Sequence, residues 1–153
     1  MTDAHSEKVR LRLQDNDGRE EFLLVTPLGE DLYRLEESPA FAYSVSLHDV
    51  VRAITGSEGG LDFAGVAERS GNRTMRVIFA KFSIDSKQAR PILKRLRKLG
   101  CHCDNSQASV LSVTLPSAVK LDEVTEYLKS LELWWEHADP TFEDLYGPDM
   151  LTE

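Results

Sequence analysis

The second half of the chain alternates between strand and helix patterns in a fixed order. Apolar residues spaced three and four apart predict two helices, one over Ala89, Ile92, Leu93, Leu96 and Leu99 and one over Leu121, Val124, Leu128 and Leu131. Short apolar runs predict strands at residues 74–79, 101–104, 110–115 and 133–138, with a turn at 105–107. The order strand-helix-strand-strand-helix-strand is typical of a ferredoxin-like unit, in which two helices cover one face of a four-stranded antiparallel sheet.

The first half shows no helical period. Five short strand patterns, at residues 7–14, 21–27, 32–35, 50–54 and 61–68, are separated by turn residues such as Gly18, Gly29 and Gly56. This spacing predicts a small antiparallel β-barrel or sandwich. We therefore expect an α+β protein with an all-β lobe at residues 1–72, a ferredoxin-like lobe at 73–138 and an acidic C-terminal tail at 139–153.

The charge of the chain is distributed very unevenly around a net value of −8. Residues 1–72 hold fourteen Asp and Glu against seven Lys and Arg, and residues 120–153 hold ten against two. Residues 73–98 hold nine Lys and Arg against Asp85 alone. Because the field near a surface depends on local charge, the acidic segments favour a basic partner.

The N-terminal residues are polar, without the apolar core of a signal peptide. No apolar run approaches the roughly 20 residues needed to span a bilayer. We expect a cytoplasmic protein with no membrane partner.

The two cysteines, Cys101 and Cys103, flank His102. This spacing differs from the C-x₂-C pair of ordinary zinc sites, and a disulfide between them would close an unusually small ring. Alternation along a strand instead predicts both cysteines on one face and His102 on the other. We expect neither a metal ion nor a cofactor.

Two segments resemble a known family. Residues 43–51, YSVSLHDVV, are similar to a "VSxGDVV" element, and residues 68–77, ERSGNRTMRV, to an "ERSGxxTxRV" element. Both elements occur in a bacterial family of small domains of unknown function, numbered 4265 among such families. His48 stands where that pattern favours glycine. The resemblance implies a bacterial source and no particular activity, and it directs attention to Asp49 and to Ser70-Gly71.

The C-terminal region combines large apolar rings with carboxylates. Aromatic residues are enriched at the anchors of protein interfaces, and like charges steer an oppositely charged partner. We therefore predict a protein-binding module, specifically an acidic immunity protein (antitoxin) that neutralises a basic bacterial toxin by covering its active surface. The residues predicted to contact the partner are Trp134, Glu136, Phe142, Glu143, Asp144 and Tyr146. In the opposing interpretation Trp135 and Phe142 belong to the core and the tail docks on the chain's own basic helix.

Two alternatives remain open. A small anion or metabolite, with or without catalysis, would bind in the cleft between the lobes near His48, Ser70, Gly71, Arg73 and Arg76. RNA would bind along the basic helix, at Arg90, Lys94, Arg95, Arg97 and Lys98, although the acidic remainder of the chain disfavours nucleic acid. In plainer interpretations the residues around Ser70 and Gly71 form only a connector, and the basic residues form only a solvated helix face. No catalytic residue is predicted, because neither His48-Asp49 nor His137-Asp139 lies in a recognisable nucleophile motif.

Overall fold

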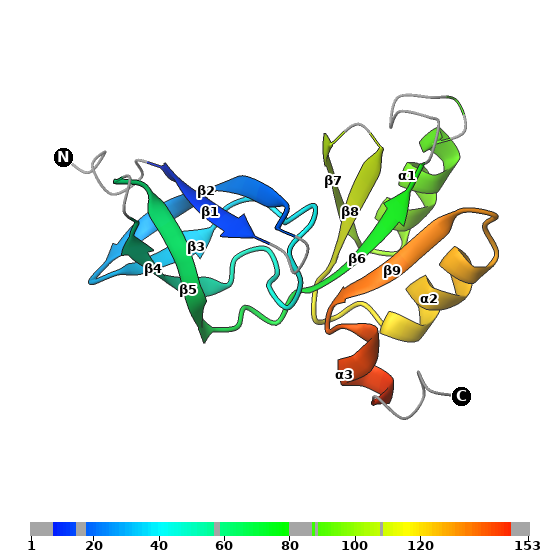
Figure 1. Cartoon of the computed structure of the whole chain (residues 1–153). Coiled ribbons are helices and arrows are strands. Elements are labelled where there is room, and N and C mark those ends of the chain that lie inside the picture. Colours follow the sequence, from blue (N-terminus) through cyan, green and yellow to red (C-terminus); the bar gives the residue numbers. More distant parts are fainter. Residues whose placement is uncertain are drawn as a thin grey trace.

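The protein consists of two lobes that stand side by side (Figure 1). The structure, a computed structural model, describes residues 8–14, 18–56, 59–79, 87, 89–107 and 109–147. The fold is mixed α+β, with more strands than helices among the described residues. The strands form a closed five-stranded barrel and a second sheet of four strands. Among the described residues no helix has the length and hydrophobicity needed to cross a membrane.

The first lobe is a closed barrel and not a sandwich, the other all-β form expected from the sequence. Its strands are β1 (Val9–Gln14), β2 (Glu20–Gly29), β3 (Leu32–Leu35), β4 (Val50–Thr55) and β5 (Leu61–Glu68). Sequential strands pair antiparallel, but the closing pair, β1 with β5, is parallel. The expectation of a wholly antiparallel arrangement is therefore corrected at the closing seam. Alternate residues such as Leu11, Leu23 and Val51 point inward and are completely or almost completely buried.

The second lobe follows the predicted element order. It comprises β6 (Arg73–Ile78), α1 (Ala89–Lys98), β7 (His102–Gln107), β8 (Val110–Leu115), α2 (Leu121–Lys129) and β9 (Trp134–Asp139). The sheet order is β7-β8-β6-β9, which leaves β9 as an edge strand. Both helices lie against the same face of this sheet (Figure 1), and their apolar stripes meet residues such as Met75 and Val77 in one core. β7 continues through residues 105–107, so the turn predicted there is wrong.

Both faces of the second sheet are covered, because the barrel lobe packs on the face opposite the helices. A loop at residues 36–49 supplies the contacts: Ser46 shares a hydrogen bond of 2.6 Å with Thr74 on β6, and Ser38 shares one of 2.6 Å with Ser112 on β8. These polar side chains are buried, and their partners satisfy them. The lobes are thus joined by a specific polar interface.

A short helix, α3 (Phe142–Tyr146), stands in the segment that the sequence analysis treats as an acidic tail. Thr141 begins it with a reciprocal capping box, in which the Asp144 N–H donates to Thr141 Oγ1 at 3.1 Å and the Thr141 N–H donates to Asp144 Oδ2 at 3.2 Å. The T-x-x-D spacing of residues 141–144 is the local signal for this helix. The last part of the predicted tail, residues 148–153, lies outside the described residues.

Candidate functional site

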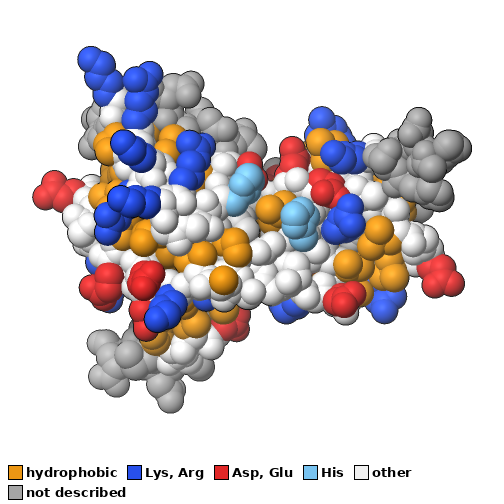
Figure 2. All heavy atoms as spheres, turned by 180° about the vertical axis from the view of Figure 1, so that it is seen from behind, with side chains coloured by type: hydrophobic (Ala, Val, Ile, Leu, Met, Phe, Trp, Pro, Cys, Tyr) orange, Lys and Arg blue, Asp and Glu red, His pale blue; other side chains and the backbone are white. Residues whose placement is uncertain are grey.

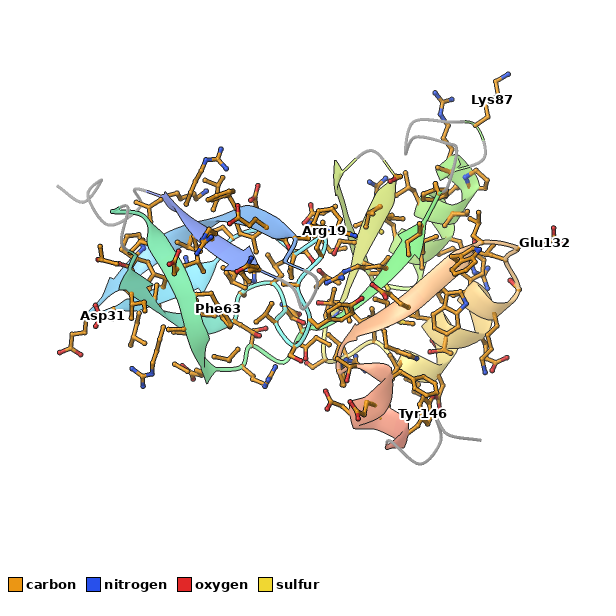
Figure 3. All side chains as sticks on the ribbon, in the orientation of Figure 1. Arg19, Asp31, Phe63, Lys87, Glu132 and Tyr146 are labelled. Carbon is orange, nitrogen blue, oxygen red and sulfur yellow. The ribbon has the colours of Figure 1, made fainter. Side chains whose placement is uncertain are left out.

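A cavity of about 930 Å³ lies between the lobes, along the edge strand β9 and beside α3. Its lining comes from the barrel strands β1 and β5, the loop at 42–44, and α2, β9 and α3. The lining residues are Leu13, Gln14, Ala42, Tyr43, Ser44, Phe63, Thr125, Lys129, Trp135, Glu136, His137, Thr141, Phe142, Glu143, Asp144 and Tyr146. Phe63 on the barrel and Tyr146 on α3 mark its two sides (Figure 3).

Four neighbouring rings form one side of the cavity, and we call them the aromatic wall: Trp135, His137, Phe142 and Tyr146. The ring centroids of Trp135 and His137 are 5.3 Å apart in an edge-to-face arrangement, and those of Phe142 and Tyr146 are 4.8 Å apart. The His137 ring joins the two pairs, at 6.2 Å from Tyr146. The wall therefore presents a continuous aromatic surface to the cavity.

His137 is the polar member of the aromatic wall. It is only 7% exposed, and its Nδ1 has no hydrogen-bond partner among the described residues. Burial lowers the pKa of His137 below its ordinary value of 6.5, and the charge of Lys129 lowers it further. The imidazole is therefore mainly neutral at pH 7, with one unsatisfied nitrogen.

The charged groups of the cavity are mostly carboxylates. Glu143 and Asp144, both on α3, are exposed, while Glu136 comes from β9. Lys129 is the cation in this lining, and it lies 3.9 Å from Glu126 on its own helix. The charged side chains of the lining are therefore three carboxylates and one ammonium.

Glu136 also fastens the two lobes together. Its carboxylate accepts hydrogen bonds from Arg76 on β6 at 3.2 Å and from the Tyr43 hydroxyl of the barrel loop at 2.8 Å. Arg76 is 2% exposed, donates a second bond to the carbonyl of Ala42, and lies under the Tyr43 ring at 4.9 Å. Burial lowers the pKa of the Arg76 guanidinium, and the charge of Glu136 opposes that shift.

Five of the six residues predicted to contact a partner line this cavity, and Trp134 does not. Trp134 is 79% exposed and pairs with Ile78 at the first position of β9, on the same face as Glu136 but outside the lining. The lining also contains Trp135, His137 and the barrel residue Phe63, which are not among the residues predicted from the sequence. Period-two alternation places Trp135 on the same face of β9 as His137, but no local signal brings Phe63 to this place.

The residues predicted to bind an anion lie outside this cavity lining. Arg73 donates to the carbonyls of Pro116 (2.8 Å) and Val119, and the Ser70 N–H donates to Asp49 at 2.8 Å. Arg76 is paired with Glu136, as described above. His48 is exposed, with its Nε2 atom 3.9 Å from a carboxylate oxygen of Glu36, and Gly71 lies at the surface.

The two segments that resemble the family meet at Asp49. Its carboxylate accepts the N–H of Ser46 at 3.0 Å and that of Ser70 at 2.8 Å, so it ties residues 43–51 to 68–77. His48 has a φ of 69°, a left-handed backbone that glycine adopts without strain. This geometry is the physical reason for a preference for glycine at that position.

A second buried carboxylate, Asp139, lies next to this junction. Asp139 accepts a hydrogen bond of 2.6 Å from Ser46 and one of 3.3 Å from Arg69. Burial raises the pKa of Asp139, while the bond from Ser46 and the charge of Arg69 act in the opposite direction.

The basic helix α1 lies away from the cavity. Arg90, Lys94, Arg95, Arg97 and Lys98 are exposed, and Figure 2 shows Lys and Arg side chains gathered on the face that α1 occupies. Within the described parts of the chain no acidic side chain forms an ion pair with them. Arg95 instead lies 5.7 Å from the ring centroid of Tyr127 on α2.

The cysteines have the environment of core residues. Cys101 is buried and Cys103 is partly buried, while His102 is exposed. Burial raises the pKa of Cys101 to about 11 and that of Cys103 to about 12. Among the described residues, no three His, Cys, Asp or Glu side chains are grouped so as to hold a metal ion.

Comparison with known proteins identifies a family and a fold. A crystal structure titled as a hypothetical protein from Neisseria gonorrhoeae is similar, with a TM-score of 0.70 and 20% sequence identity over 90% of this chain and 99% of that one. No curated protein matches significantly. A family model described as a domain of unknown function, DUF4265, matches residues 21–137, which includes both motif segments. This chain therefore belongs to the DUF4265 family.

Proposed function

We propose that this protein is a binding module that captures a basic protein through the cavity between its lobes. The observation that carries the proposal is the juxtaposition of the aromatic wall with the exposed carboxylates Glu143 and Asp144. Carboxylates at the rim accelerate the encounter with a cationic partner, and aromatic rings at the centre of an interface slow its release. The exposure of Phe142 and Tyr146, 40% and 47%, leaves apolar area for a partner to bury.

The particular class that we propose is an immunity protein, or antitoxin, whose partner is a basic bacterial toxin. Its support is the net charge of −8 together with the acidic and aromatic cavity. Inhibition would result from occlusion, so the proposal assigns no catalytic residue to this chain.

Capture from the native host tests this function directly. A tagged chain is expected to retain a basic protein in stoichiometric amount, and the double variant Phe142→Ala/Tyr146→Ala is expected to lose it. The matched control is Phe22→Ala, which removes a ring of similar exposure outside the cavity lining. A wild-type chain that retains no stoichiometric basic protein, or a retained protein whose growth inhibition is not relieved by coexpression, contradicts the antitoxin assignment.

A second candidate is the binding of a small molecule. The volume of about 930 Å³ is within the range of ligand pockets, and the rings and carboxylates of the lining offer apolar and polar contacts. The carboxylates of the lining favour a cationic metabolite over the anion considered from the sequence. A thermal-shift screen of metabolites separates this candidate from the first, since a ligand raises the melting temperature in proportion to the logarithm of its concentration once it is in excess.

Binding of RNA through α1 is the weaker third possibility that the sequence raised. Its support is the exposed row of cations at Arg90, Lys94, Arg95, Arg97 and Lys98. An affinity for single-stranded RNA that fails to decline with salt excludes it, because phosphate contacts release counterions.

We also infer that the second lobe is a ferredoxin-like unit. The element order from β6 to β9 and the sheet order β9-β6-β8-β7 support this assignment. Because that architecture serves many functions, the proposal above rests on the cavity and its side chains.

A further inference from the structure

The aromatic wall has the composition of a site for a cationic side chain. Phe142 and Tyr146 stand one turn apart on α3 and share an exposed surface, while Trp135 and His137 continue it on β9. An ammonium or guanidinium group is attracted to the face of such rings, and its aliphatic stem packs on them as well.

The charges around the wall select a cation rather than an apolar group. The carboxylate of Glu143 has no hydrogen-bond or ion-pair partner within the described residues. Asp144 gives one oxygen to its own helix cap and is otherwise exposed. A norleucine side chain has the four-carbon stem of lysine but lacks the ammonium group, so it would gain nothing from these two carboxylates.

His137 is compatible with a cationic side chain at the wall. Its neutral ring adds no positive charge to the cavity at pH 7, and its buried Nδ1 lacks a partner in the described structure. The charged and titratable groups that line the cavity around it are Tyr43 on the barrel loop, Lys129 on α2, Glu136 on β9, and Glu143, Asp144 and Tyr146 on α3.

We propose that the aromatic wall, with Glu143 and Asp144, is a recognition pocket for one lysine or arginine side chain, and this inference rests on the proposed function. It names the chemical group by which a basic partner is recognised. The remaining contacts of the partner then extend over the rim of the cavity.

A direct binding assay tests the pocket without the partner. In a Trp134→Phe background Trp135 is the single tryptophan, because the chain contains two, and it reports from the wall. The probes are the blocked tripeptides Gly-Lys-Gly, Gly-Arg-Gly and Gly-norleucine-Gly. The lysine and arginine peptides are expected to change the Trp135 emission saturably and to bind roughly tenfold more tightly than the norleucine peptide.

Two variants and two controls locate the binding. Glu143→Gln and Tyr146→Leu are each expected to weaken the lysine peptide by roughly fivefold. Glu123→Gln, on an exposed acidic residue outside the lining, and Phe22→Leu are expected to leave its affinity unchanged. Circular dichroism of each variant verifies that it is folded.

The pH dependence of peptide affinity tests whether His137 lies beside the bound cation, because a residue that only supports the fold would not produce it. As the pH falls below 6.5, protonation of His137 places a positive charge in the wall and the lysine peptide is expected to bind more weakly. A His137→Gln variant is expected to lose the part of this dependence that lies below pH 6.5 and above the range in which ordinary carboxylates titrate.

The outcomes separate this inference from the proposed function. Equal binding of the norleucine and lysine peptides, or no saturable response to either cationic peptide, overturns the pocket, even if the chain still captures a basic protein from its host. Selective binding of the cationic peptides by a chain that captures no protein supports the pocket and contradicts the proposed function.

Discussion

Arg76 and Glu136 form an ion pair of 3.2 Å across neighbouring strands, and this pair joins the fold to the cavity. Arg76 is buried between the sheet and the barrel loop, where it also donates to the carbonyl of Ala42. Glu136 lines the cavity with its carboxylate held by Arg76 and Tyr43. The interface between the lobes thus fixes the position of Glu136 in the cavity lining.

Removing the carboxylate of this pair is expected to destabilise the protein. Glu136→Gln leaves the buried charge of Arg76 without its counterion, at a cost of about 2 kcal/mol, which is below the range for fully buried pairs because Glu136 is partly exposed. Urea unfolding measures the change. The double variant Arg76→Met/Glu136→Gln is expected to lose less than the sum of the two single variants, and strict additivity would contradict the coupling.

Glu21 is predicted to be a stabilising residue although it is charged and buried. Its carboxylate accepts the N–H groups of Ala40, Phe41 and Ala42 at 2.7–2.8 Å, which fixes the loop that leads to Tyr43. Glu21→Gln replaces one acceptor oxygen by a donor and is expected to cost about 3 kcal/mol in urea unfolding. Glu20→Gln, next to it on β2, breaks only an exposed ion pair with Arg12 and is expected to cost less than about 1 kcal/mol. Equal effects of the two changes would refute the anchoring role.

Asp139 is expected to make the free energy of unfolding decrease as the pH rises, because its carboxyl pKa is raised in the folded protein. Its folded-state pKa lies above the ordinary 3.8, so the stability that its proton contributes is fully present below pH 3.8 and is lost as the pH rises through the folded-state value. Relative to Asp139→Asn, the wild-type protein is therefore expected to lose free energy of unfolding as the pH rises above 3.8. Urea midpoints of both proteins across that window measure the difference, and a difference that is constant or of opposite slope would contradict the prediction.

The cysteine thiols are expected to react slowly in the folded protein. With the pKa of Cys101 at about 11 and that of Cys103 at about 12, both are protonated at pH 8, and the thiolate is the reactive form. Labelling by a disulfide reagent at pH 8 is expected to be about a hundredfold slower in buffer than in urea. Immediate labelling of both thiols in buffer would show that the β7 region opens readily.

Much of the architecture was accessible from local pattern. The apolar stripes of α1 and α2 repeat every three or four residues, and the strands alternate, so each element can be inferred from its own residues. The mistaken turn at 105–107 shows the limit of that inference, because polar residues continue β7 beside β8. The helix α3 was missed although its capping residues Thr141 and Asp144 are three apart.

The cavity was not accessible in this way. The C-terminal aromatic and acidic residues are near one another in sequence, so they could be proposed as a surface, and Phe142, Glu143 and Tyr146 do line the cavity together. Arg76, by contrast, is predicted from the sequence to bind an anion, but in the structure its buried guanidinium is paired with Glu136.

Periodicity and charge are local properties, so the sequence predicts most of the helices and strands, their order and the acidic character of the C-terminal region. Contacts between distant segments close the barrel through a parallel pair of strands and place His137 and Phe63 in one cavity. Packing of the barrel loop on the second sheet brings together side chains more than seventy residues apart, and no local pattern records such a contact.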